Sequence, residues 1–276
     1  MPVAPYHLRF YINEKAKENA FFADGLALRK HTHQAGRARF QTGFDMGQFV
    51  GYAIKAKRTF KLYVESDDPL LDPLVNYINV RCGYSAARKA PDQLTTNWLN
   101  ARSFGLTNAT PLVFTLLNEI KKIRQLAIVD FENVTLMSRN NTEMADWLRY
   151  DAILPVLGVQ CPVIKLPSSF WQSEKKDTVI TVPAPSANNP SLYTFHTPDK
   201  PIYLQPARIA QGGSDVLDMH LAFYLGIINQ LFSDIDIHIV SKDTDYHPLV
   251  HLMQSGHGWD NRINQLNPET NQYLIS

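Results

Sequence analysis

Gln125-Leu-Ala-Ile-Val-Asp130 is an apolar run that ends in a carboxylate, and it decides the fold. A short run of this kind is typical of a buried strand in a parallel sheet. Downstream, the sequence predicts an apolar helix from Val216 to about Leu231, a strand from Ile235 to Val240 and a helix from about Pro248. This alternation of strands and helices predicts an α/β domain whose parallel sheet is wrapped by helices.

Two further segments lie between the first strand and the apolar helix. Residues 135–150 are predicted to be helical, with Met137, Met144, Trp147 and Leu148 as core positions. Residues 161–206 contain eight prolines and short β-type runs at 178–182 and 202–204. Because proline cannot donate to a strand ladder, we expect extended segments and loops there, with a hairpin inserted into the domain.

The N-terminal half is predicted to form a second α/β domain, in tandem with the first. It would cover residues 1–110, with a linking helix at 111–124 before the domain at 125–276. Residues 62–75, LYVESDDPLLDPLV, align without gaps with residues 237–250, IHIVSKDTDYHPLV, with five identities. We expect a degenerate copy of the C-terminal domain in which Asn13 stands in the place of Asp130. An unrelated N-terminal domain is the alternative.

The composition limits the classes of protein. A content of 45% apolar and 11% aromatic residues is enough to bury a core, and the net charge of +1 excludes nucleic-acid binding through bulk charge alone. The two cysteines, Cys82 and Cys161, match no metal-ligand spacing. With no signal-peptide pattern and no apolar run of about 20 residues, we expect a cytoplasmic protein without a membrane partner.

Two aspartates end the predicted strands of the C-terminal domain or follow them closely. Asp130 closes the first strand, and Asp243 lies three residues beyond Val240. Ligands of parallel sheets bind outside the carboxyl ends of the strands, so we expect these carboxylates to meet there. Neighbouring carboxylates require a counter-ion, and oxygen ligands suit Mg²⁺ or Mn²⁺. Such a site indicates phosphoryl chemistry.

Three motifs resemble those of PIN-like nucleases of the NYN type. They are Ile128-Val-Asp-Phe-Glu-Asn-Val134, the helix with its approach at 213–226, and Ile239-Val-Ser-Lys-Asp-Thr-Asp-Tyr246 with Pro248-Leu249. The resemblance covers about residues 125–258. It implies a three-layer, Rossmann-like parallel sheet and a metal-dependent endoribonuclease that hydrolyses phosphodiester bonds of single-stranded RNA. A catalytically inactive RNA-binding or assembly protein that retains this fold is the alternative.

The resemblance also implies roles for individual residues. Asp130, Asp218 and Asp243 would be the catalytic metal ligands, and Asn133 would orient the scissile phosphate or a water. The secondary ligands would be Asp215 and Asp245, and either Glu143 or Asp146 would supply a further acid. Each aspartate also has a structural alternative, as a cap or turn residue before a helix.

Basic residues suggest where an RNA backbone would bind. The predicted contacts are Arg29, Lys30, Arg37 and Arg39 in the N-terminal half and Lys242 beside Asp243. A solvated basic face is the alternative for the N-terminal group. On the leading hypothesis, the N-terminal half positions substrate or mediates formation of a homodimer.

Overall fold

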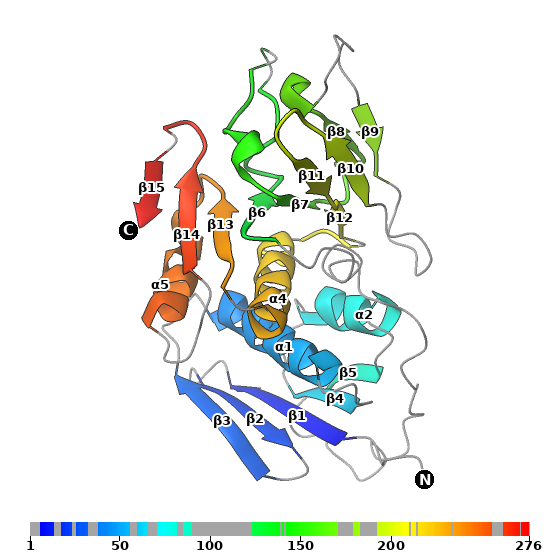
Figure 1. Ribbon diagram of the computed structural model, residues 1–276. Coiled ribbons are helices and arrows are strands. Elements are labelled where there is room, and N and C mark those ends of the chain that lie inside the picture. The colour runs from blue at the N-terminus through cyan, green and yellow to red at the C-terminus, as the bar shows by residue number, and fades with distance from the viewer. Residues whose placement is uncertain are drawn as a thin grey trace. The chain divides into compact units, whose positions relative to one another are not determined.

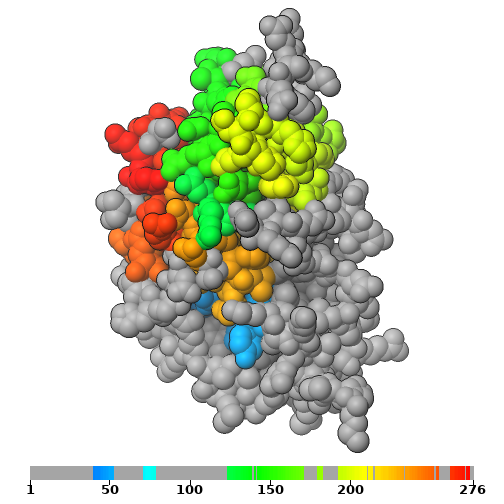
Figure 2. All heavy atoms as spheres, in the orientation of Figure 1, coloured from blue at the N-terminus to red at the C-terminus, as the bar shows by residue number. Residues whose placement is uncertain are grey.

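The structure is a computed structural model. It describes residues 6–13, 18–23, 26–32, 38–55, 60–65, 71–81, 85–89, 123–138, 140, 142–170, 179–182, 192–209, 211–213, 215–232, 234–255, 262–270 and 272–275. In the N-terminal half, side chains are described only at 40–52 and 71–78. Figure 2 colours the residues whose atoms are placed. Contacts divide the chain into two compact units, residues 1–111 with 213–231 and residues 112–212 with 232–276.

The second unit is built on a mostly parallel sheet of eight strands. Its strands follow the order β10-β11-β7-β6-β13-β14-β15, and β12 also pairs with β7 (Figure 1). The parallel strands are β6 (Gln125–Asp130), β7 (Ala152–Leu157), β11 (Pro201–Leu204), β12 (Ala207–Arg208), β13 (Asp236–Val240) and β14 (Arg262–Asn267). Two antiparallel strands, β10 (Tyr193–His196) and β15 (Gln272–Ile275), close its edges.

The centre of this sheet is apolar because both of its faces are covered. Every residue of β7 and five of the six residues of β6 are buried, as expected for central strands of a parallel sheet. The helix α5 (His247–Ser255) follows β13 after the short 3-10 helix η6 (Thr244–Tyr246). The α/β class predicted from the sequence is confirmed, and so are the predicted bounds of β6.

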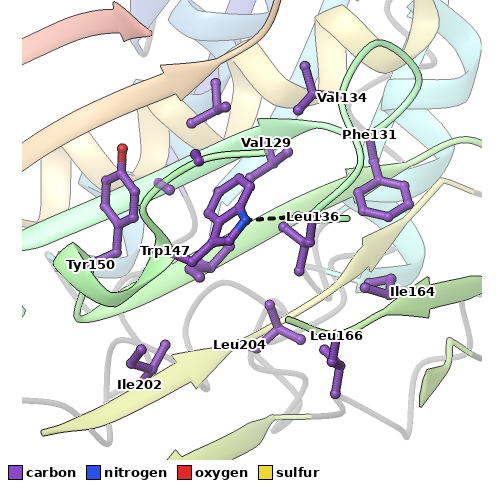
Figure 3. Packing of buried hydrophobic residues seen from close by; sticks show 14 of the residues in the cluster. Val129, Phe131, Val134, Leu136, Trp147, Tyr150, Ile164, Leu166, Ile202 and Leu204 are labelled. Carbon is purple, nitrogen blue, oxygen red and sulfur yellow. Dashed lines mark hydrogen bonds between the residues drawn. The ribbon is translucent and has the colours of Figure 1, made fainter. Parts of the chain in front are cut away.

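The helix predicted over residues 135–150 is wrong. The chain turns back on itself there: Met137 and Glu143 form an antiparallel bridge, and the Met144 N–H donates to the Leu136 carbonyl over 3.1 Å. Among the described residues of this segment, only 147–149 are helical, as the 3-10 helix η4 (Trp147–Arg149). The indole of Trp147 donates to the Leu136 carbonyl over 2.9 Å (Figure 3), so the apolar side chains meet across a turn.

The segment at 161–206 is only partly an insertion. β8 (Val163–Lys165) and β9 (Val179–Thr181) form the antiparallel pair that the predicted hairpin requires. β11, however, pairs in parallel with β7, with Tyr203 opposite Ala152, and is therefore a strand of the main sheet. The sheet tolerates a proline in β11 because Pro201 is the first residue of the strand.

The first unit contains a sheet of different topology. Its order is β3-β2-β1-β4-β5, from β1 (Tyr6–Asn13), β2 (Glu18–Ala23), β3 (Leu26–Thr32), β4 (Phe60–Glu65) and β5 (Ser85–Lys89). The first three strands are antiparallel neighbours, whereas β1, β4 and β5 are parallel. Tandem related domains therefore stay a prediction, and the predicted linking helix at 111–124 lies almost wholly outside the described residues.

The described residues of this unit include the helices α1 (Ala38–Lys55), α2 (Asp72–Arg81) and α4 (Val216–Leu231). The predicted bounds of α4 are confirmed. α4 packs closely against α1 along glycines spaced four residues apart. A Cβ at Gly47 would lie less than 3.0 Å from the Phe223 carbonyl oxygen, and one at Gly226 equally close to the Phe44 carbonyl oxygen. The two backbones touch because these positions lack side chains. No helix among the residues described is long and apolar enough to cross a membrane.

A buried histidine lies in the middle of β13. His238 is 3% exposed, with Nδ1 2.9 Å from the Tyr150 hydroxyl and Nε2 3.3 Å from the Tyr273 hydroxyl. Arg149 donates to the same Tyr273 hydroxyl over 2.8 Å. The pKa of His238 is lowered to about 4, mainly by burial and also by the charge of Arg149, with Asp236 partly opposing the shift.

Replacing Gly47 with alanine should destabilise the protein. Alanine normally stabilises a helix relative to glycine by about 1 kcal/mol, but here its methyl group meets the Phe223 carbonyl and should cost about 1–3 kcal/mol. Urea denaturation measures the change, and Asn76→Ala, at an exposed position of α2, is the control. A Gly47→Ala variant as stable as the wild type would contradict the close helix packing.

The free energy of unfolding should fall as the pH drops from about 6.5 to about 4. In that range the unfolded state, in which histidine has a pKa of about 6.5, binds a proton that folded His238 does not. Above pH 6.5 both states are neutral and this contribution vanishes. In denaturation series at pH 7.5 and 5, we expect a smaller loss for His238→Gln than for the wild type. Equal losses of unfolding free energy in the two proteins would contradict a lowered pKa of His238 in the folded state.

Candidate active site at the carboxyl ends of the parallel strands

Asp130 is a buried carboxylate at the end of β6. It is 0% exposed, and its Oδ2 accepts hydrogen bonds from Asn133 Nδ2 over 2.6 Å, from Ser241 Oγ over 2.9 Å and from the Tyr246 hydroxyl over 3.3 Å. Oδ1 accepts one long bond of 3.4 Å from the Asn133 N–H. One carboxylate oxygen is therefore held firmly, whereas the other has free acceptor capacity.

The parallel pairing of β6 with β13 brings these groups together. Val129 lies opposite Val240, so the next residues, Asp130 and Ser241, leave the sheet side by side. The Ser241 hydroxyl donates to Asp130 and accepts from the Asp243 N–H over 3.0 Å. One serine thus links the carboxylate of Asp130 to the backbone of Asp243 in the loop after β13.

The loop that carries Asp243 is shaped by its own side chains. Asp243 Oδ1 accepts from the Asp245 N–H over 2.9 Å and caps η6. This is the capping role given above as the structural alternative for Asp243. From β14, the buried Gln265 donates to the carbonyl oxygens of Ser241 and Asp243. Asp245 itself is exposed. The loop is therefore fixed from the adjacent strand.

A second acid, Glu132, lies close to Asp130 in the turn that follows β6. Partial burial raises the pKa of Glu132, which remains in contact with solvent, and the negative charge of Asp130 raises this pKa further. Its carboxylate lies over Gly158, the first residue after β7, where an added Cβ would lie 3.1 Å from Glu132 Cδ. Glu132 therefore belongs to the same edge of the sheet as Asp130.

Other predicted site residues are placed as follows. Asp218 lies in the first turn of α4, and Asp215 precedes that helix with a φ of 61°. Both belong to the compact unit that contains α4, so their action with Asp130 stays a prediction. Glu143 accepts from the Ser169 N–H over 3.2 Å, whereas Asp146 is exposed, and neither is joined to Asp130 by a hydrogen bond in the described chain.

The predicted RNA-binding residues are mostly untested. Arg37 and the side chains of Arg29, Lys30 and Arg39 lie outside what the structure describes. Lys242 is exposed and forms an ion pair with Glu269 over 2.5 Å. An exposed pair of this kind contributes little to stability and can open when an anion approaches.

The donor set around Asp130 is compatible with a divalent cation. Its hydrogen-bond donors in the described chain are all neutral, and a buried carboxylate without a positive partner is costly. A hard cation at Oδ1 would offset that cost. No group of three His, Cys, Asp or Glu residues suited to a metal ion is present among the placed residues. Asp130 and its neighbours fit such an ion as part of a hydrated site.

Sequence reasoning did not identify Ser241, Tyr246 or Gln265 as parts of this site. Serine, tyrosine and glutamine are common in cores and loops, and their role here depends on which strands are neighbours. Glu132 was visible two residues after Asp130. The sequence alone did not show that its carboxylate turns toward the end of β7.

Comparison with known proteins identifies the C-terminal half. Residues 124–262 match the family model of the PIN domain. This match leaves residues 1–123 uncovered, and no comparison supports a second copy there. No curated protein and no solved structure gave a match to the chain.

Replacing Ser241 with alanine should lower the free energy of unfolding by about 1–3 kcal/mol, because the buried carboxylate of Asp130 loses a donor and the Asp243 N–H loses its acceptor. Thermal or urea denaturation measures this. Thr244→Ala, at an exposed position of the same loop, should change stability by less than about 0.5 kcal/mol. Equal stability of the two variants would show that the serine bridge is not formed.

Proposed function

Because this chain belongs to the PIN-domain family, a family of nucleases, we propose that it is a metal-dependent endoribonuclease that hydrolyses phosphodiester bonds of single-stranded RNA. The observation that carries the proposal is the buried carboxylate of Asp130. It ends the middle strand of the sheet and receives only neutral hydrogen bonds from the part of the chain that is described. Such a carboxylate is suited to bind a positive ion.

In this proposal, Asp130, Asp218 and Asp243 hold Mg²⁺ or Mn²⁺, with Asp215 and Asp245 acting through water. When bound, the cation activates a water and stabilises the charge that develops on the phosphodiester. Asn133 has a separate task. Its amide donates to Asp130 Oδ2, which supports a role in holding that carboxylate so that Oδ1 keeps acceptor capacity for an ion. Its position just after the strand also suits contact with the scissile phosphate.

The proposed substrate is RNA held through its phosphates. Lys242 supports this because it is exposed and follows Ser241 at the end of β13. Arg29, Lys30, Arg37 and Arg39 are proposed to extend the contact along the backbone. A net charge of +1 makes such binding local, so affinity should depend on a few phosphate contacts and fall with salt.

A second candidate function is that of a catalytically inactive RNA-binding or assembly protein with the same fold. It is favoured by the finding that no three-residue metal-binding group occurs among the described residues and by the role of Asp243 as a cap. Metal titration distinguishes the two functions. Stabilisation of the folded protein by Mn²⁺ favours the nuclease, since a ligand that binds the folded state raises the melting temperature.

The decisive experiment uses purified full-length protein, Mn²⁺ and a labelled single-stranded RNA. Asp130→Asn should reduce cleavage by on the order of 100-fold or more, because the buried anion is lost while the amide keeps its shape. The matched control is Asp199→Asn, which removes the same charge from an exposed turn before β11. Since β11 and β7 are parallel and Tyr203 lies opposite Ala152, that turn is at the amino-terminal edge of the sheet.

Cleavage that persists unchanged in Asp130→Asn would indicate a contaminating nuclease and would remove the support for this proposal. Circular dichroism and a melting curve for both variants establish that each is folded. A DNA strand of the same sequence tests the preference for RNA.

A further inference from the structure

The turn after β6 is anchored so that one acid faces outward. The Phe131 N–H extends the ladder to the Val156 carbonyl over 3.0 Å, and the N–H groups of Asn133 and Val134 return to the Asp130 carbonyl over 3.2 and 2.8 Å. Phe131 and Val134 are buried in the core (Figure 3). Glu132, between these anchors, is exposed. The backbone from which the Glu132 side chain extends is therefore fixed by its neighbours.

Gly158 supplies the space that the Glu132 carboxylate occupies. A Cβ at this position would lie 3.1 Å from Cδ of Glu132 and closer still to Oε1. The backbone of Gly158 does not itself demand glycine, since Gly213 is the one glycine with positive φ among those described. Gly158 therefore matters because it lacks a side chain, and not because its backbone has an unusual φ.

Hydrogen bonds fix the backbone at the end of β7, next to the Glu132 carboxylate. The Gly158 carbonyl accepts from the Cys161 N–H over 3.1 Å, and the Val159 carbonyl accepts from the guanidinium of Arg208 in β12. Both bonds fix the loop through its backbone. Gly158 therefore stays beneath Glu132 without engaging its oxygens.

The Glu132 carboxylate has no hydrogen bond or ion pair with any residue that the structure places, although the charge of Asp130 acts on it. Two carboxylates that repel one another without a positive group between them are unfavourable in the protein alone. Oδ1 of the buried acid accepts only one long hydrogen bond, and neither oxygen of the exposed acid has a partner among the described residues. Both carboxylates at the end of β6 thus retain acceptor capacity that no described group uses.

We infer that Glu132 is a metal-ligating residue of the candidate site, paired with Asp130, and that Gly158 is the positioning residue that makes room for its carboxylate. The inference rests on the proposed function, and it names an acid outside the set predicted from the sequence. Glu132 supplies the ligand from the solvent side, where RNA phosphates would approach, whereas Asp130 supplies the ligand from the core.

The experiment measures Mn²⁺ binding by calorimetry and the Mn²⁺-induced shift in melting temperature, beside RNA cleavage. Glu132→Gln should weaken Mn²⁺ binding by on the order of 10- to 100-fold. Gly158→Ala should weaken it similarly although every carboxylate is retained, because the methyl group displaces Glu132. The control is Gly212→Ala, whose Cβ would meet only Val159 Cγ2 at 3.8 Å and should leave binding unchanged.

The double variant Glu132→Gln with Gly158→Ala separates displacement of Glu132 from general damage. If the methyl group acts through Glu132, the double variant binds Mn²⁺ no more weakly than Glu132→Gln alone. A further loss in the double variant would overturn the role of Gly158. Wild-type Mn²⁺ binding in Glu132→Gln, with binding lost in Asp130→Asn, would overturn the role of Glu132 and leave the proposed function standing. Absence of Mn²⁺ binding in the wild type would overturn both.

Discussion

The register between β6 and β13 is the constraint on which the site depends. With Val129 opposite Val240, the carboxylate of Asp130 and the hydroxyl of Ser241 emerge at hydrogen-bond distance. A slip of one residue would turn every side chain of β13 to the opposite face and place the buried His238 where isoleucines now pack. The same hydrophobic burial that stabilises the sheet therefore sets the geometry of the acids. Core and site cannot be altered independently along these two strands.

The fold could be predicted where local pattern and burial agree. β6 and α4 are largely apolar, and their bounds matched the prediction. The helix predicted at 135–150 failed because its apolar residues meet through a reversal of the chain, closed by the indole of Trp147. Periodicity alone cannot distinguish these two ways of bringing apolar side chains together. The strand β11 was missed as a member of the main sheet because prolines surround it.

The site was predictable only in its acids. Asp130 could be recognised because a carboxylate that ends an apolar run has few structural explanations. Ser241 and Tyr246 donate hydrogen bonds to Asp130 only because β6 and β13 are neighbours, and the sequence does not show the order of the strands. Glu132 is the intermediate case, since its type was evident and its direction was not. That direction depends on Gly158, which lies 26 residues further along the chain (158 − 132).

The close approach of α1 and α4 has a consequence for how this chain could be divided. The family match begins at residue 124, so α1 lies outside it. α4 lies within the match and packs backbone to backbone against α1. A fragment trimmed to the matched residues would lack α1 and would leave the face of α4 around Gly226 without the helix that packs on it. An exposed apolar surface of this kind favours self-association. The evolutionary unit and the physically autonomous unit therefore differ in extent in this protein.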